Sequence, residues 1–330
     1  MKKAVRVIVF LLIFAMAISF FDNLLCRKET DGWWNVTAKL DGFYNSPKNE
    51  YDMMYFGSSN TYCSFNPLVV WKERGIKSYV FATQQQPVWA TYHYMADAFK
   101  TQHPKVAVVD ILMFSKNDEY YDDGVNYTFC DNMPFSLNKI ELVRASVPKG
   151  QRFNLLFRFM KYHSRWNDLK KEDFLYKKSS MRDYSKGYYV LTAECDDAIK
   201  TDTEKVTAAA ELSSKNLEYL QKIIDLCNEK GIELMLVKTP SNSTPEETEY
   251  FNAVAKIAKQ NGIFYCDYNQ EYKQIGLDIK TDFFDKTHLN TSGAEKFSKY
   301  FADNLPDLEF SDGSADKEWE CDYNKYLAEK

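Results

Sequence analysis

The chain has 330 residues, which is long enough for one large α/β domain or for one domain with a sizeable insertion. Its hydrophobic fraction of 45% and its charged fraction of 27% are those of an ordinary globular protein. The formal net charge of -5 argues against nucleic acid as the main partner, because phosphate binding requires a clustered positive surface.

The chain begins with a basic segment that is followed by an apolar one. Lys2, Lys3 and Arg6 stand at the start, and the apolar run continues to Phe21. Counted from Ala4 this run has about 18 residues, which is near the lower limit for crossing a bilayer. Basic residues on the amino-terminal side predict a cytoplasmic N-terminus and an exported body.

Three interpretations of this segment remain open. Ala15-Met16-Ala17 is an A-x-A site, which is typical of a cleaved signal peptide. Apolar residues continue beyond this site, which favours an uncleaved signal anchor over residues 1–22. The third interpretation is a buried core helix. We expect the anchor, and therefore a single-pass protein of the cell membrane whose main domain lies outside the cytoplasm.

Residues 23–50 are polar and turn-rich, and they predict a stalk. Short apolar runs bounded by turn residues then predict five strands, at 53–56, 78–82, 106–113, 232–237 and 263–266. Helical patterns alternate with them, at 67–75, 87–100, 204–230, 246–260 and 292–304. This alternation indicates a parallel sheet covered on both faces. We therefore expect residues 51–305 to form an α/β domain, a three-layer α/β/α sandwich around a five-stranded parallel sheet.

Two parts of the chain depart from the alternation of strands and helices. Residues 115–203 carry clusters of Asp, Asn and Tyr and an aromatic segment from Phe153 to Met160, and they predict a mixed helical and loop insertion over one edge of the sheet. Residues 306–330 are acidic and polar, and they predict a loose C-terminal tail.

The first candidate for chemistry is the segment Gly57-Ser58-Ser59, which directly follows the first predicted strand. In an open parallel sheet, ligands bind beyond the carboxyl ends of the strands. Glycine permits a sharp turn there, and a serine at the head of the next helix has free backbone N–H groups beside it. Ser59 is thus suited to be a nucleophile whose oxyanion is held by its own amide. The simpler alternative is a turn in which serine caps the helix.

The second candidate is the segment from Asp285 to His288, just before the last predicted helix. A hydroxyl is a weak nucleophile near neutral pH and needs a base within hydrogen-bond reach. Histidine is the usual base, and a carboxylate on its other ring nitrogen fixes the tautomer. The spacing D-x-x-H lets one short loop supply both groups. Taken alone the pair is weak, because a chain with four His and many Asp contains such a pair easily by chance.

Together the two segments resemble the SGNH (GDSL-like) hydrolase superfamily, over about residues 50 to 304. The shared features are G-S-S after the first strand, D-x-x-H-x-N before the last helix, and a five-strand pattern between them. The resemblance implies a flavodoxin-like sandwich with Ser59, Asp285 and His288 as a catalytic triad. Ser58 replaces the usual Asp of the GDS motif. The G-S-S variant is most similar to tethered extracytoplasmic acyl-transfer members, namely the teichoic acid D-alanyl-transfer proteins and the alginate or peptidoglycan O-acetyltransferases.

The oxyanion blocks depart from the superfamily pattern. A glycine is expected after the second strand, where this chain has Ala82 followed by Thr83-Gln84-Gln85. A backbone N–H at Thr83 or Gln85 would still serve, beside that of Ser59. The third block, normally G-x-N-D, is echoed by Ser115-Lys116-Asn117-Asp118, a few residues late. Asn117 is therefore either an oxyanion donor or a loop cap.

The resemblance implies an extracytoplasmic serine esterase or O-acyltransferase that acts on ester groups of a cell-surface polysaccharide. It also implies a partner, a multi-pass membrane O-acyltransferase that hands acyl groups outward. Replacement of the GDS aspartate keeps a second class open, a non-catalytic assembly or binding module on the same fold. We expect no cofactor and no metal, because the sequence has no P-loop, dinucleotide fingerprint or metal-ligand spacing.

Overall fold

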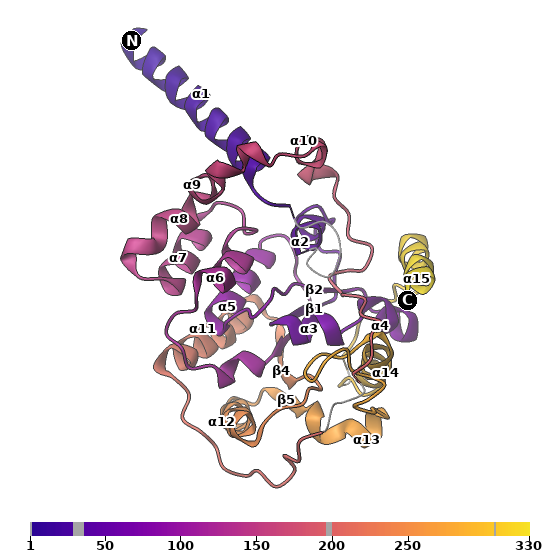
Figure 1. Ribbon diagram of the computed structural model, residues 1–330. Helices are drawn as coiled ribbons and strands as arrows, with labels where there is room; N and C mark the ends of the chain where they lie inside the picture. Colours follow the sequence, from indigo (N-terminus) through magenta and orange to yellow (C-terminus); the bar gives the residue numbers. More distant parts are fainter. Residues whose placement is uncertain (1, 29–35, 196–199, 307) are drawn as a thin grey trace.

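The computed structural model describes residues 2–28, 36–195, 200–306 and 308–330. Five strands and a series of helices follow one another along the chain (Figure 1). The strands are β1 (Met53–Phe56), β2 (Ser78–Val80), β3 (Val106–Asp110), β4 (Glu233–Lys238) and β5 (Phe264–Asp267). The helices of the α/β core are α3 (Ser59–Ser64), α4 (Pro67–Arg74), α5 (Val88–Ala98), α11 (Ser214–Lys230), α12 (Pro245–Asn261), α13 (Tyr272–Ile275) and α14 (Thr291–Asp303). The remaining helices are α1 (Lys2–Leu25), α2 (Val36–Tyr44), α6 (Asp123–Cys130), α7 (Leu137–Ser146), α8 (Arg152–Leu156), α9 (Arg158–Tyr162), α10 (Lys171–Leu175) and α15 (Lys317–Glu329).

The five strands form one parallel sheet in the order β2-β1-β3-β4-β5. The predicted α/β class and the predicted five-stranded parallel sheet are therefore confirmed. In this order the chain leaves β1 toward one edge for β2 and returns past β1 to β3. Crossovers that diverge on either side of a strand leave a crevice at its carboxyl end, which is where ligands bind in open α/β sheets.

Every residue of β1 and β3 is buried, because helices cover both faces of the sheet at these strands. Helix α5 packs against α11, and α4 packs against α14. Figure 1 shows these two pairs on opposite sides of the strands. Strand β4 reads ELMLVK and is buried from its second residue, as expected for a central strand that contacts helices on both faces.

Helix α11 begins at Ser214, not at 204 as the sequence pattern suggested. The reason is local: the side chain of Ser213 accepts a hydrogen bond from the N–H of Asn216 and caps the helix there. Its other end agrees with the prediction, because Gly231 adopts a left-handed conformation with φ 64° directly after Lys230.

Helix α1 projects from the domain as a single 24-residue helix (Figure 1). It is long and apolar enough to cross a membrane, with a mean hydropathy of 2.6 over its most apolar window, none of which is buried against the rest of the protein. A cleaved signal sequence would meet the same criterion, so the length and the composition of the helix do not separate the first two interpretations. The third interpretation, a buried core helix, is wrong for this segment.

The predicted stalk over 23–50 is wrong over much of its length. Residues 36–44 form α2, and its Phe43 is 1% exposed with its ring 4.0 Å from that of Phe81. Residues 29–35 lie outside the described residues. The polar pattern misled because α2 buries its polar side chains through specific partners: Lys39, for example, bonds Ser185 and the carbonyl of Tyr188.

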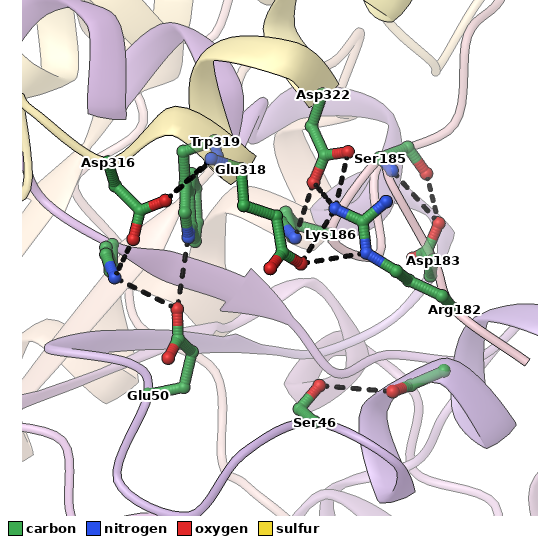
Figure 2. Close-up of polar contacts among 12 residues, drawn as sticks. Ser46, Glu50, Arg182, Asp183, Ser185, Lys186, Asp316, Glu318, Trp319 and Asp322 are labelled. Carbon is green, nitrogen blue, oxygen red and sulfur yellow. Dashed lines mark hydrogen bonds and ion pairs between the residues drawn. The ribbon is translucent and has the colours of Figure 1, made fainter. Parts of the chain in front are cut away.

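The predicted loose tail over 306–330 is also wrong, because α15 packs onto the domain next to α4. Trp319 is 1% exposed and donates its indole N–H to Glu50 over 3.1 Å. Asp322 pairs with Arg182 at 2.6 Å and with Lys186 at 2.8 Å (Figure 2). The charges that made this segment look solvated are thus partly paired within the domain.

In its described part, residues 115–195 and 200–203, the insertion consists of short helices and irregular segments, as predicted. Its last part returns to the sheet: Val80 donates its backbone N–H to the backbone carbonyl of Lys186 over 2.9 Å, which covers the free edge of β2. Tyr188, Tyr189 and Leu191 are then buried. The insertion therefore contributes side chains to the core as well as covering the edge of the sheet.

Candidate active site

The turn from β1 into α3 brings Ser59 to the carboxyl end of the sheet. Gly57 has φ +152°, and a Cβ there would lie 2.2 Å from the hydroxyl of Thr61, so only glycine fits this turn. Ser58 is 1% exposed, and its hydroxyl has no hydrogen-bond partner among the described residues. Its side chain also does not cap α3. The turn therefore buries Ser58 and leaves Ser59 as the accessible hydroxyl.

The loop before α14 is closed on itself at the same end of the sheet. Phe283 and Leu289 form an isolated antiparallel bridge, and Phe284 donates its N–H to the carbonyl of His288. Asn290 ends the loop as the N-cap of α14, accepting a hydrogen bond from Gly293. These contacts hold the segment from 284 to 288 as a short, fixed turn.

Ser59, His288 and Asp285 form a continuous hydrogen-bonded chain. The hydroxyl Oγ of Ser59 lies 2.8 Å from Nε2 of His288, although 229 positions separate the two residues. On the other side of the ring, Nδ1 of His288 lies 2.8 Å from Oδ2 of Asp285 and 3.0 Å from its Oδ1. The predicted meeting of Ser59 and His288 at the carboxyl edge of one parallel sheet is confirmed.

The electrostatics of Asp285 fix the direction of these hydrogen bonds. Desolvation acts to raise the pKa of Asp285, but the hydrogen bond and charge of His288 and the backbone N–H groups of Thr287 and His288 outweigh it, and the pKa lies well below its usual range. An ionised carboxylate only accepts hydrogen bonds, so Nδ1 of His288 carries a proton. In a neutral ring Nε2 then has a free lone pair, which accepts the hydrogen bond from Ser59.

Asn60 links the two segments that carry the chain of hydrogen bonds. It is 2% exposed and donates its side-chain amide to the carbonyl of Thr287 over 2.9 Å. Asn60 adjoins Ser59, and Thr287 adjoins His288, so this bond sets the position of one segment against the other. Its role is to position the reactive groups, and neither the spacing nor the motif of the sequence indicated it.

A cavity of about 50 Å³ opens beside Ser59 and His288. Mainly apolar and aromatic side chains surround it. They come from α3, from the turn after β2, from the end of the insertion and from the loop before α14, and the full lining is Ser59, Tyr62, Cys63, Gln84, Tyr189, Leu191, Phe284 and His288. In the part of the chain that the structure describes, no carboxylate and no ammonium group contributes to this lining. A cavity of this size holds only a few non-hydrogen atoms.

Tyr62 and Cys63 stay neutral in this lining. Burial, together with the neighbouring Cys63, raises the pKa of Tyr62 well above its usual value although the hydrogen bond with Ser59 opposes this. Burial and the charge of Asp285 likewise raise the pKa of the Cys63 thiol well above its usual value, against the effect of Lys39. Cys63 is therefore a protonated thiol, which is a poor nucleophile.

A buried lysine supports the aromatic wall of the cavity. The rings of Tyr62 and Tyr189 stack with centroids 4.1 Å apart, and Nζ of Lys39 lies 4.5 Å from the centroid of Tyr189. Desolvation lowers the pKa of Lys39, and Asp183, at 3.7 Å, opposes this effect. Helix α2 thus contacts the wall of the cavity, because its Lys39 lies against the ring of Tyr189.

Residues 31–309 match the model of an uncharacterised protein family. The chain belongs to that family. The matched range contains Ser59, Asp285 and His288, together with the whole sheet. A comparison with curated protein sequences found no match.

The three predicted oxyanion residues other than Ser59 do not occupy equivalent positions in the structure. The turn with Thr83 and Gln85 does reach the cavity, but it is Gln84, between them, that lines it. Thr83 is fully buried and donates its hydroxyl to Gln86 over 3.0 Å, which holds the turn. Gln85 is exposed and has φ 47°.

Asn117 is not at the cavity, and its prediction as an oxyanion donor is wrong. Its amide donates to the hydroxyl of Tyr250 over 2.9 Å, and its carbonyl oxygen accepts the N–H of Ser213. Asn117 therefore fastens the loop after β3 to α11 and α12, as the alternative of a loop cap anticipated. The echo of the third block was late in sequence because it lies beyond the end of β3, which stops at Asp110.

Sequence reasoning also missed the contribution of the insertion to the cavity. Tyr189 and Leu191 line it, and Leu191 is held in place because its carbonyl accepts the N–H and the hydroxyl of Thr291. The run Tyr188-Tyr189-Val190-Leu191 was the available signal, since it is the one compact apolar stretch near the end of an otherwise polar segment.

Within the described ranges, no group of three or more His, Cys, Asp or Glu side chains is arranged to hold a metal ion.

Proposed function

We propose that the protein is a serine esterase or O-acyltransferase of the SGNH type that acts on ester groups of a cell-surface polysaccharide. The observation that carries the proposal is the hydrogen-bonded chain from Ser59 through His288 to Asp285. The strand order, with Ser59 directly after β1 in the crevice between diverging crossovers, supports the three-layer sandwich of that superfamily. The polysaccharide as substrate and the location outside the cytoplasm are inferred from the resemblance to that superfamily.

In the proposed reaction Oγ of Ser59 attacks the carbonyl carbon of an ester while its proton moves to Nε2 of His288. The negative charge that develops on the carbonyl oxygen is stabilised by the backbone N–H of Ser59 and by donors of the turn at Gln84. Collapse of this intermediate breaks the ester bond, and the proton on His288 goes to the leaving alcohol. Asp285 stabilises the imidazolium ring between these two transfers.

The second half of the reaction repeats these steps with a new acceptor. Water or a sugar hydroxyl gives its proton to Nε2 of His288 and attacks the acyl carbon on Ser59. The bond between this carbon and Oγ then breaks, and His288 returns the proton to Oγ, which restores the free hydroxyl. Water as acceptor makes the protein an esterase, and a sugar hydroxyl makes it a transferase. For the transferase, we propose a multi-pass membrane O-acyltransferase as the partner that delivers the acyl group.

The cavity favours a small, uncharged acyl group. About 50 Å³ accommodates an acetyl group within the cavity, whereas a longer acyl chain would extend out of it. A D-alanyl group carries an ammonium ion that requires a carboxylate or several acceptors when it leaves water, and the described lining offers no carboxylate. Of the two kinds of acyl group that the resemblance implies, acetyl therefore fits better.

Labelling with a fluorophosphonate tests the proposal directly, because only an activated serine reacts with it. We expect one label on the wild-type chain, none on the Ser59→Ala variant, and full labelling of Ser58→Ala, which is the matched control at the neighbouring hydroxyl. Absence of labelling in a folded wild-type protein would favour the alternative of a non-catalytic module.

The location is tested separately. Protease treatment of intact protoplasts should remove the domain and leave α1 protected.

A further inference from the structure

The segment from Lys149 to Lys178 differs in charge from the rest of the protein. It contains nine Lys and Arg and three Asp and Glu, a formal net charge of +6, whereas the whole chain carries -5. Three of these cations, Arg158, Lys161 and Lys178, are paired with carboxylates outside the segment. The exposed side chains of Lys149, Lys170, Lys171 and Lys177 carry the positive charge of this part of the insertion, which includes α8, α9 and α10. A surface of this kind attracts an anionic partner.

The same part of the protein exposes large apolar side chains. Outside α1, eleven such side chains are exposed among the described residues, and eight of them lie between 135 and 175. Three of them form one aromatic cluster: the ring of Phe157 lies 4.8 Å from that of Phe153 and 6.3 Å from that of Phe135. Trp166 is 68% exposed. The eight are Phe135, Leu137, Phe153, Phe157, Met160, Trp166, Phe174 and Leu175. Exposed apolar side chains that gather in one part of a protein mark a surface that binds a protein partner or a membrane.

These helices are fixed to the end of α1 by charged hydrogen bonds. The guanidinium of Arg158 donates to Asp22 at 2.5 Å and 3.1 Å, and the backbone N–H of Phe159 donates to the same carboxylate at 3.1 Å. Arg165 donates to the carbonyl of Leu25 over 2.6 Å, close to the C-terminus of the helix, where a cation is favourable. Figure 1 shows α9 and α10 at the base of α1, on either side of it. The basic and apolar surface therefore has a fixed height along α1.

That height is the membrane surface if α1 spans the bilayer. The apolar run of α1 ends at Phe21, and Asp22 is the first charged residue after it. A carboxylate that is paired with Arg158 belongs at the level of the lipid headgroups. Aromatic side chains, tryptophan above all, are favoured at this level, and basic side chains bind anionic headgroups there.

We propose that Arg152–Leu175 forms an interfacial platform, which rests on the surface of a bilayer containing anionic lipids and surrounds the exit of α1. Its exposed aromatic rings enter the boundary between headgroups and acyl chains, and its lysines contact the headgroups. The platform depends on α1 spanning the membrane but not on the catalytic role of Ser59. It adds a second membrane contact to the anchor and prevents the domain from turning freely about α1.

Quenching of Trp166 by brominated lipids tests this proposal on the full chain in nanodiscs that contain phosphatidylglycerol. The Trp166 signal is the difference between the emission of the wild-type chain and that of Trp166→Phe. The matched control places a tryptophan on α11, as Leu217→Trp in the Trp166→Phe background, because Leu217 is 42% exposed and α11 packs on α5 and β4. We expect Trp166 to lose most of its emission and the control to lose none.

The ionic part of the proposal is tested with Lys170→Gln/Lys171→Gln. Both lysines are exposed, and this double variant should reduce quenching of Trp166 in anionic nanodiscs toward the value in neutral ones. Lys256→Gln/Lys259→Gln on α12 is the matched control and should change nothing. Quenching of Trp166 no greater than that of the control tryptophan would overturn the proposal. A second result would also overturn it: Trp166 is shielded from a water-soluble quencher in native membranes, but brominated lipids in nanodiscs do not quench it. A protein partner, and not lipid, would then cover the platform.

Discussion

Replacing Asp285 by Asn separates two roles of this carboxylate. Its Oδ1 accepts the backbone N–H of Thr287 at 2.7 Å and that of His288 at 2.9 Å, whereas its Oδ2 is the atom nearest to Nδ1 of His288, at 2.8 Å. An asparagine that places its carbonyl oxygen at the position of Oδ1 keeps both backbone hydrogen bonds. We therefore expect Asp285→Asn to fold with a Tm close to that of the wild type.

The chemistry should nevertheless fail in this variant. The asparagine NH₂ group at the position of Oδ2 is a donor, so Nδ1 of His288 has to accept and the ring proton moves to Nε2. An Nε2–H group facing Ser59 cannot take the proton of its hydroxyl. In serine proteases this wrong tautomer lowers kcat by about 10⁴, so we expect a loss of roughly 10³ to 10⁴ here.

The assay is hydrolysis of p-nitrophenyl acetate, with kcat, KM and Tm measured for each variant. Asp303→Asn, the same substitution at an exposed position on α14, is the matched control and should match the wild type in all three. Asp285→Ala should lower Tm more than Asp285→Asn, because it also removes the acceptor for the two loop N–H groups. If Asp285→Asn kept the wild-type kcat with an unchanged Tm, the orientation of His288 by Asp285 would be refuted.

The pH dependence of stability follows from the depressed pKa of Asp285. A carboxyl group whose folded pKa lies below its unfolded pKa of about 4 stabilises the native state above that pH. The contribution disappears as the pH falls through the folded pKa. Any difference in Tm between the wild type and Asp285→Asn should therefore be largest near neutral pH and shrink below about pH 4.

Five further single variants, and one double variant, test the site and the fold. Ser59→Ala and His288→Ala should each cost several orders of magnitude in kcat, and the double variant little more, because the residues act as a unit. Ser58→Ala should keep kcat and leave the free energy of unfolding unchanged or higher by up to ~1 kcal/mol, because it removes a buried hydroxyl that has no partner among the described residues. Leu191→Ala should enlarge the cavity and shift the preference from acetate toward butyrate esters. Trp319→Ala should destabilise the domain by about 3–5 kcal/mol.

Matched controls make these outcomes specific. Leu327→Ala, on the same helix as Trp319 but 40% exposed, should stay within about 1 kcal/mol of the wild type in urea unfolding. Equal effects of the two substitutions would mean that α15 is not part of the core. A loss of activity in Ser58→Ala with full activity in Ser59→Ala would move the nucleophile by one position. An unchanged chain-length preference in Leu191→Ala would place the acyl group outside this cavity.

The strands and the hydrogen-bonded chain of Ser59, His288 and Asp285 could be predicted because their signals are local. Each strand is a short apolar run, and Gly57 and the D-x-x-H spacing are fixed by the geometry of a turn and of a loop. The parallel order of the sheet then brings Ser59 and His288 to the same edge. No long-range information was needed beyond the rule that strands in such sheets end on one side.

The remaining errors concern residues whose role depends on a distant partner. Asn60 acts through Thr287, 227 positions away, and nothing around it in sequence indicates that contact. The polar helices α2 and α15 were misread for the same reason. Lys39 is buried against distant partners that include Ser185, and Asp322 is buried against Arg182 and Lys186. Composition predicts solvent exposure for such segments, and specific pairing overrides it.

The insertion connects the candidate membrane contact with the candidate reaction site. One part of it, Arg152–Leu175, is bonded to the end of α1 through Asp22 and Leu25. Its last part lines the cavity with Tyr189 and Leu191, and the carbonyl of Leu191 is bonded to the start of α14 directly after the loop that carries His288. A chain segment that is fixed at both ends restricts the orientation of the cavity relative to α1. Under the function that we propose, the site would reach esters only within a limited distance of the membrane, and acyl transfer from a membrane-embedded donor requires this geometry.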